Sequence, residues 1–281
     1  MTRSNDIPRP IGRRRLAFAI ALVAGFAHNT VAHSQGSSQM TSAPPDVVKE
    51  LAPTGTLRVG INLGNIVLAQ TDASGELKGV TADLARELGR RLNVPVELKR
   101  FDAAGKSFDA MKSGSLDIVF LAIEPVRAAE VAFSAPYVII EGVYMVPKDS
   151  SIKSVDEVDR DGVRIAVNKA SAYDLFLSRS LKHAQLVRGD SGVELFVKDK
   201  LEAAAGVKQP IVAYAKTNPN VRVLDGRFME IQQAMGTAKG RDTGARYLHG
   251  FIEEMKASGF VADALKRSNQ PDASVAPPAT P

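Results

Sequence analysis

Two opposite charges lie three residues apart at the end of an apolar run in the segment AIEPVRAAEVAFSAPY, residues 122–137. They are Glu124 and Arg127. A guanidinium group has parallel N–H donors that match the two oxygens of a carboxylate, so Arg127 could hold a carboxylate ligand. It could also be an exposed loop charge, or a structural partner of Glu124. The spacing alone leaves these three interpretations open.

The other residue types that carry chemistry show no catalytic or metal-binding pattern. The chain has no cysteine, and its four histidines are scattered at positions 28, 33, 183 and 249. Their spacing is not that of a metal site, and no glycine-rich segment has the lysine and hydroxyl spacing of a phosphate loop. No Ser-His-Asp or Cys-His set is visible. The sequence therefore predicts no metal, no cofactor and no catalytic residue.

Positive charge is concentrated at the start of the chain. The formal net charge is +5, and residues 1–33 carry five arginines against Asp6 alone. The remainder is almost neutral, which gives no reason to expect nucleic acid as a partner. The first segment also has the layout of an export signal, with GRRR, an apolar run at residues 16–27 and the small-residue segment HNTVAHSQG. Because that run is too short to span a bilayer comfortably, we expect residues 1–33 to be a cleaved signal peptide rather than an anchor.

Strand and helix patterns alternate along the rest of the chain. The segments TLRVGIN, VPVELKRF and LDIVFLAI are typical of strands, and DLARELGRRL places Leu84, Leu88 and Leu92 on one face of a helix. With the short helix SFDAMKSG, the order β-α-β-α-β predicts helices packed on a mostly parallel sheet. After YVIIEGVYMVP the pattern restarts with the strand VRIAVN, and the chain ends in the amphipathic helices TGARYLHGFIEEMKASG and FVADALKRS.

This restart predicts two α/β lobes joined by two crossings of the chain. We expect a first lobe made of residues 55–146 and 233–268, and a second lobe made of residues 147–232. The polar, proline-containing segments 34–54 and 269–281 are expected to be disordered. Neither has enough apolar surface to offset the entropy of ordering.

Several segments, taken in order, resemble the periplasmic solute-binding proteins of polar-amino-acid ABC importers, the bacterial extracellular solute-binding protein family 3. They are GTLRVGIN, LKGVTADLARELGRRL, SGSLDIVFLAIEPVRAAEVAFSAPY, VRIAVNKASAYD and MKASGFVADALKR, and they span about residues 55–267. The resemblance implies a type II periplasmic-binding-protein clamp, in which two lobes, each a mostly parallel sheet flanked by helices, close on a small ligand. It also implies a periplasmic monomer that docks on an ABC permease in the inner membrane.

The resemblance further implies where the ligand binds. Arg127 stands where the family's arginine pairs with the ligand's α-carboxylate, and Ala122 keeps only its backbone N–H at a family donor position. In NKASAYD, Ser171 stands at a second carboxylate contact, although it could instead cap the helix that follows, and the two roles are compatible. Free N–H groups at that helix start would attract an anion. The predicted ligand residues are Asn62, Asn65, Ala122, Glu124, Arg127, Asn168, Ser171, Ala172, Tyr173 and Gln233.

Three departures from the family pattern concern the ligand's amino group and side chain. Asn62 and Asn65 stand where the family has acidic and aromatic residues. Val207 and Lys208 stand where a family aspartate holds the ligand's ammonium group. Glu124 replaces a family threonine, and it could pair structurally with Arg127 or hold a ligand ammonium in place of the missing aspartate.

Three polar residues in the two crossings are ambiguous. Glu141 could face the cleft or be solvated, and solvation is the favoured interpretation. Gln232 and Gln233 could line the cleft floor or form hydrogen bonds across the hinge.

The sequence therefore predicts an exported solute-binding protein that captures an amino acid or a related small carboxylate and delivers it to an ABC importer. An exported dehydratase acting on a cyclic carboxylate such as arogenate or prephenate is an alternative on the same fold, with Glu124 or Glu141 as general acid. It is disfavoured because Val207 or Lys208 occupies the second-lobe position that could carry the acid. A subunit that presents its ligand to a receptor is a third possibility.

Overall fold

The computed structural model describes residues 43–270 and 273–279, all within the compact unit Met40–Pro281. The predicted signal peptide, residues 1–33, lies outside the described residues. Among the described helices, none is long and apolar enough to cross a membrane.

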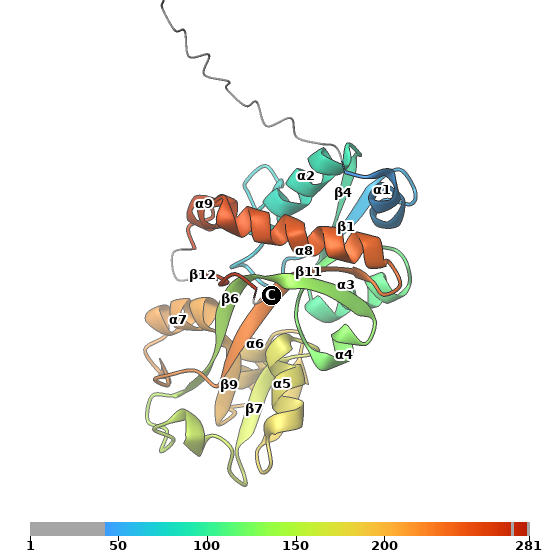
Figure 1. Cartoon of the computed structure of the whole chain (residues 1–281). Helices are drawn as coiled ribbons and strands as arrows, with labels where there is room; N and C mark the ends of the chain where they lie inside the picture. Colours follow the sequence, from blue (N-terminus) through green and yellow to red (C-terminus); the bar gives the residue numbers. More distant parts are fainter. Residues whose placement is uncertain (1–42, 271–272, 280–281) are drawn as a thin grey trace, which may run out of the picture. The chain divides into compact units, whose positions relative to one another are not determined.

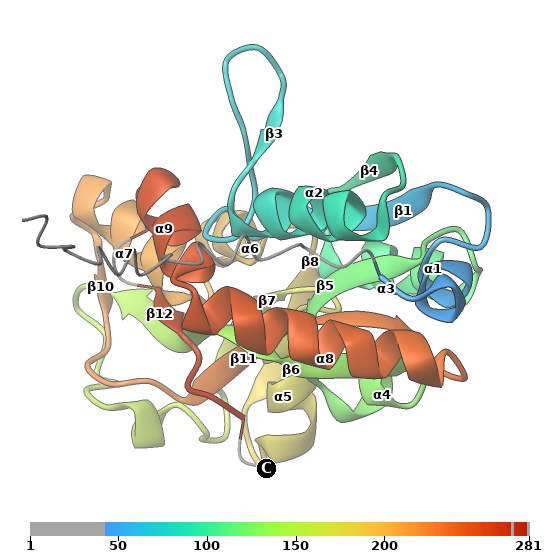
Figure 2. The same ribbon diagram turned by 45° about the horizontal axis from the view of Figure 1, so that its top comes forward.

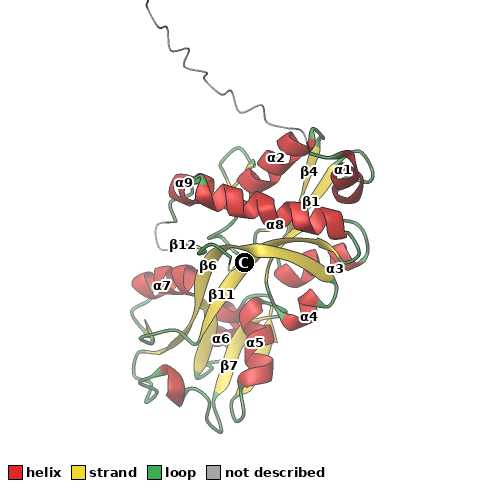
Figure 3. Cartoon of the chain, in the orientation of Figure 1, coloured by secondary structure: helices red, strands yellow, loops and turns green. Residues whose placement is uncertain are grey.

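The helices and strands alternate along most of the chain (Figures 1 and 3). The helices are α1 Pro45–Leu51, α2 Val80–Leu92, α3 Ala104–Lys112, α4 Pro125–Ala128, the 3-10 helix η1 Val155–Glu157, α5 Ala172–Ser180, α6 Gly192–Lys198, α7 Lys208–Thr217, α8 Asp242–Ala257 and α9 Phe260–Arg267. The strands are β1 Leu57–Asn62, β2 Gln70–Thr71, β3 Leu77–Lys78, β4 Val96–Phe101, β5 Ile118–Ala122, β6 Val131–Pro147, β7 Arg164–Asn168, β8 Gln185–Gly189, β9 Ala203–Val207, β10 Val221–Val223, β11 Met229–Ala238 and β12 Ser274–Val275.

The first lobe is built on the parallel strands β4, β1 and β5, in that spatial order. Alternate residues of β5 enter two cores. Ile118 and Phe120 belong to the core that includes α2 and α8, whereas Val119 and Leu121 pack with α3 on the other face. This burial on both faces explains the continuous apolar run LDIVFLAI. The strands β2 and β3 form a separate hairpin that projects from the lobe (Figure 2).

The second lobe is built on the parallel strands β8, β7 and β9. Ala166 of β7 packs with the core that contains α6 and α7. Its neighbours Ile165 and Val167 face the opposite side, where they join Leu177 of α5. The central strand of each lobe is therefore covered by helices on both faces, as a parallel sheet requires.

Two long strands, β6 and β11, cross between the lobes. β6 pairs antiparallel with β11 over most of its length and with β9 near its end, and β11 also pairs antiparallel with β5. Within the described residues, all strands except β2 and β3 therefore belong to one sheet, ordered β4-β1-β5-β11-β6-β9-β7-β8, with β10 and β12 added to β6. The lobe boundaries expected at 146/147 and 232/233 fall inside β6 and β11, and they stay predictions.

The prediction of disorder for residues 34–54 is wrong for the described part of that segment. Residues Pro45–Leu51 form α1, whose buried side chains Val47 and Leu51 face α8. The N–H of Gly244 donates to the carboxylate of Glu50 at 2.7 Å. Although the segment is polar overall, it contains two apolar residues four positions apart, which lie on one face of a helix. Packing of that face against the rest of the protein stabilises even a short helix.

The prediction of disorder for residues 269–281 is also wrong where the structure describes them. Ser274 and Val275 form β12, which pairs antiparallel with β6, and the N–H of Ala276 donates to the carbonyl of Tyr137 at 3.1 Å. An unpaired strand edge offers backbone donors and acceptors to a neighbouring segment whatever its side chains are. Composition therefore gave no sign of this pairing.

Candidate functional site

A cavity of about 180 Å³ lies where the carboxyl ends of parallel strands from both lobes meet. Strands β1, β5, β7 and β9 end at Asn62, Ala122, Asn168 and Val207, and all four residues line the cavity. In open α/β sheets, ligands bind outside the carboxyl ends of the strands. The volume is below the roughly 300–1,000 Å³ of pockets for drug-sized ligands, so the cavity suits a small molecule.

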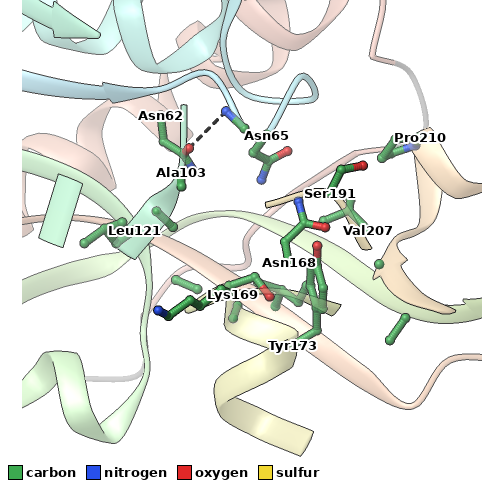
Figure 4. Close-up of a pocket in the computed structure, with 18 of the residues that line it drawn as sticks. Asn62, Asn65, Ala103, Leu121, Asn168, Lys169, Tyr173, Ser191, Val207 and Pro210 are labelled. Carbon is green, nitrogen blue, oxygen red and sulfur yellow. Dashed lines mark hydrogen bonds between the residues drawn. The ribbon is translucent and has the colours of Figure 1, made fainter. Parts of the chain in front are cut away.

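All the predicted ligand residues except Glu124 line this cavity. Figure 4 shows Asn62 and Asn65 on one side of it, and Asn168 and Tyr173 on the opposite side. The lining residues among those predicted are Asn62, Asn65, Ala122, Arg127, Asn168, Ser171, Ala172, Tyr173 and Gln233.

Arg127 is a buried cation in the cavity wall. It lies in the short helix α4, which begins after the extended residue Glu124 and has Pro125 at its first position. Only 1% of Arg127 is exposed. Its Nη1 donates to the carbonyl of Ala122 at 3.2 Å, and its Nη2 donates to the carbonyl of Ala170, in the second lobe, at 2.9 Å. Burial lowers its pKa to about 10, an effect that the negative charge of Glu124 partly opposes, so the guanidinium is positive at neutral pH.

Glu124 lies beside the cavity, and its carboxylate bonds to a different arginine. Only 2% of the residue is exposed. Its Oε2 accepts a hydrogen bond from Nη1 of Arg179, in α5 of the second lobe, at 2.5 Å. The sequence had left open a pairing with Arg127 or with a ligand ammonium group. The structure instead gives Glu124 a partner across the two lobes.

Three asparagines in the wall have their side-chain oxygens already bonded to backbone N–H groups. Asn62 Oδ1 accepts from Gly64 at 3.0 Å (dashed line in Figure 4). Asn168 Oδ1 accepts from Gly192 at 2.8 Å. Asn65 Oδ1 accepts from the N–H of the residue two positions on, at 3.3 Å. These bonds fix the orientation of each amide and leave its NH₂ group as a donor without a partner among the described residues.

The turn between β7 and α5 is held by a buried aspartate. Asp174 Oδ2 accepts from the N–H of Ala170, and its Oδ1 accepts from Nε of Arg188, both at 2.8 Å. Ala170 has a left-handed φ of +57°, a conformation that this hydrogen bond supports. Ser171 Oγ accepts from the N–H of Asp174 at 3.1 Å, so Ser171 caps α5 while lining the cavity. The next residues, Ala172 and Tyr173, supply N–H groups of the first helical turn, which have no acceptors within a helix.

Tyr173 also lines the cavity. Burial raises its pKa to about 12, and a hydrogen bond with Ser171 partly opposes this shift. The hydroxyl is therefore protonated at neutral pH and can serve as a hydrogen-bond donor.

The residues that the sequence left ambiguous have distinct positions. Glu141 is outside the cavity wall and bonds to Lys208 at 2.6 Å and to Arg227 at 2.7 Å. Gln233 is buried and lines the cavity. Gln232 is exposed, and its carbonyl accepts from the N–H of Ile123 at 2.9 Å.

Several wall residues were not predicted from the sequence. Asp102 and Ser191 follow the strands β4 and β8, and Lys169 follows β7. The rule that ligands bind at the carboxyl ends of parallel strands could have found all three. Ile211 and Val193 come from helices, and no signal in the sequence pointed to them.

Comparison with known proteins identifies one family. The model of the bacterial extracellular solute-binding proteins, family 3, matches residues 57–268. The chain is 25% identical over 211 residues to the glutamine-binding protein of Geobacillus stearothermophilus, with 72% of this chain and 80% of that protein covered.

Two solved structures are similar at the same level of identity. The solute receptor for L-cysteine of Neisseria gonorrhoeae has a TM-score of 0.68 at 25% identity, covering 80% of this chain and 94% of the receptor. The ancestral amino acid-binding protein AncCDT-1, a precursor of cyclohexadienyl dehydratase, has a TM-score of 0.65 at 25% identity. The match covers 78% of this chain and 97% of that protein.

Proposed function

Since the chain belongs to the bacterial extracellular solute-binding proteins, family 3, we propose that it captures a small carboxylate in the cavity between its lobes and delivers it to an ABC importer. In this proposal, residues 1–33 direct export and are cleaved, and the mature protein acts as a monomer in the periplasm. The relatives are binding proteins for amino acids, which supports a ligand of that size.

The observation that carries the proposal is the buried guanidinium of Arg127. The described residues accept hydrogen bonds from two of its five N–H donors, and both acceptors are neutral carbonyls. A buried charge is costly unless it is paired, and Glu124 is bonded to Arg179. A carboxylate in the cavity would give Arg127 a matching anion, and the start of α5 would support it from the second lobe.

The contacts between the lobes support a clamp. Arg127 bonds to Ala170, and Glu124 bonds to Arg179, so two residues three positions apart in the first lobe are bonded to the β7–α5 turn and to helix α5 of the second. A ligand bound between the lobes would add to these contacts only when the lobes are together. Ligand binding therefore favours the closed arrangement by its differential affinity for it.

A dehydratase would need a carboxylic acid in the cavity with a raised pKa. Among the described residues of the wall, Asp102 is the only acid, and a hydrogen bond from Lys106 lowers its pKa. Glu141 is outside the wall and its pKa is lowered by Lys208 and Arg227. These directions are opposite to what a general acid needs, and Glu124 does not line the cavity and is bonded to Arg179. We therefore favour a binding protein without this activity.

A thermal-shift screen over amino acids and small organic acids tests the proposal. A ligand at about one hundred times its Kd stabilises the folded protein by about 2.7 kcal/mol, which corresponds to a rise in Tm of about 5–11 °C for a chain of this size. The Arg127→Gln protein should fold but show no ligand-induced rise in Tm. Arg127→Met offers a second variant of similar volume.

Arg222→Gln is the matched control. Arg222, in β10, also donates to backbone carbonyls, those of Lys148, Ser150 and Ile152, but it does not line the cavity. This variant should keep the full ligand-induced rise in Tm. The proposal fails if only neutral sugars or peptides stabilise the protein, or if arogenate or prephenate is turned over.

A further inference from the structure

The charged side chains around the cavity are mostly positive. Arg127 and Lys169 line it, and among the described residues Asp102 is the only acid that does so. The side chain of Asp102 is 72% exposed, and its carboxylate is bonded to Lys106 at 2.7 Å. The acid is therefore at the solvent-exposed rim with its charge already compensated, and among residues 43–270 and 273–279 no other carboxylate lines the cavity.

Within the described part of the chain, the three asparagine side chains of the wall have free donors and partly used acceptors. The amide oxygens of Asn62, Asn65 and Asn168 are bonded to backbone N–H groups, which leaves their NH₂ groups for the ligand. The carbonyls of Ala122 and Ala170 each accept from Arg127. An ammonium group has three donors and no acceptor, so the NH₂ groups of these amides offer it no hydrogen bond, and each of their oxygens has only its second lone pair left to accept one.

Three helices also begin at the cavity. α3 starts after Ala103, α5 after Ser171 and α7 after Val207, and each of these three residues lines the wall. The beginning of a helix carries a partial positive charge, which favours anions and disfavours cations. The backbone thus adds to the positive potential that Arg127 creates.

One part of the wall is apolar. Ala205, Val207 and Ile211 line it together, from β9 and the helix α7 that follows. An ammonium group against these side chains would lose its hydration without gaining a hydrogen-bond acceptor. This part of the wall suits carbon atoms of a ligand.

We propose, building on the carboxylate site proposed above, that the ligand is an organic acid that carries no ammonium group. Its carboxylate pairs with Arg127, its carbon skeleton lies against Val207 and Ile211, and a second oxygen acceptor meets the NH₂ groups of Asn62 and Asn65. Glu124 takes no part in recognising an amine, because it does not line the cavity and its carboxylate is bonded to Arg179.

Calorimetric titration of the purified chain with matched ligand pairs tests this. Each pair is an L-amino acid and the carboxylic acid of the same carbon skeleton, such as glutamate and glutarate, glutamine and 4-carbamoylbutanoate, or valine and 3-methylbutanoate. We expect the member without the amine to bind at least about tenfold more tightly in the pairs that bind. A preference below tenfold, or for the amino acid, would overturn the inference while leaving the carboxylate clamp intact.

The failure of the proposed function has a different signature. If no member of any pair binds, the carboxylate clamp at Arg127 is refuted and this inference falls with it. If the members without an amine bind equally well to wild type and to Arg127→Gln, the carboxylate clamp is again refuted.

Val207→Asp supplies a second test, because it places a carboxylate in the apolar part of the wall. Val207 is the extended residue before α7, a position that aspartate and asparagine both suit. Val207→Asp should shift the preference within a pair toward the amino acid by at least about tenfold, since a charge-assisted bond to the ammonium becomes possible. Val207→Asn, of the same shape but neutral, should produce no such gain. An equal gain in both variants would contradict the inference.

Discussion

Gly105 brings α3 of the first lobe against the β7–α5 turn of the second. A Cβ atom added at Gly105 would lie 2.7 Å from the Cβ of Ala170, closer than such atoms approach in proteins. The turn is fixed by the left-handed conformation of Ala170 and by its hydrogen bond to Asp174. Gly105→Ala should therefore keep the lobes from closing fully and leave the open protein without strain.

The expected effects on affinity and stability have opposite signs. Overpacking by a methyl group costs about 1–3 kcal/mol, which weakens ligand binding about 5- to 150-fold if the cost falls on the closed form alone. Alanine is favoured over glycine inside a helix by up to about 1 kcal/mol. The free variant should therefore melt at the wild-type temperature or up to about 4 °C higher.

Calorimetric titration and thermal melting of the same samples measure both effects, using the carboxylate that gives the largest thermal shift with wild type. Gly250→Ala is the control, because it lies in α8 and an added Cβ there has nothing within 4 Å. It should raise stability similarly and leave affinity unchanged. If Gly105→Ala binds the ligand as tightly as wild type, the contact with Ala170 does not form in the bound protein and the reasoning is wrong.

Two further predictions concern ion pairs. Arg179→Gln should weaken ligand affinity because it breaks the interlobe bond to Glu124. A partly exposed ion pair contributes roughly 1 kcal/mol, which corresponds to a loss of affinity of about fivefold. Adding Glu124→Gln should then cost little more, and fully additive losses in the double-mutant cycle would contradict a shared contact. For Glu141, hydrogen bonds from Lys208 and Arg227 lower the pKa. Its contribution to stability is therefore present above the unfolded pKa of about 4.3 and is lost as the pH falls through the lower folded pKa. Glu141→Gln should lower Tm at pH 7, and the difference from wild type should shrink toward about pH 3. A difference that grows on acidification would refute this assignment.

The sequence predicted the fold and the position of Arg127 because both depend on local patterns. The apolar run LDIVFLAI predicts a strand that is buried on both faces, and Arg127 lies in the short helix that follows this strand. The fold brings the carboxyl ends of the parallel strands together regardless of the loop sequences. Asn62 and Asn168, which end two of these strands, therefore line one cavity.

The rest of the site depends on contacts between distant residues. Glu124 and Arg179 are 55 positions apart, and nothing near Glu124 in the sequence distinguishes this partner from Arg127. The orientation of the asparagine amides depends on backbone N–H groups such as that of Gly192, which lies 24 residues from Asn168. The helix α1 depends in the same way on α8, which lies almost two hundred residues further along the chain.

β12 lies beside the part of β6 that β9 does not reach, pairing with Val138 and Ile139. The family match ends at residue 268, before this strand begins. A recombinant chain that ended at residue 268 would lack β12, so the backbone groups of β6 at Val138 and Ile139 would lose their partner on that edge. Because a bare edge is a template for a second chain, the shortened protein is expected to self-associate at its crossing strand, whereas a chain that extends to residue 279 keeps the edge covered.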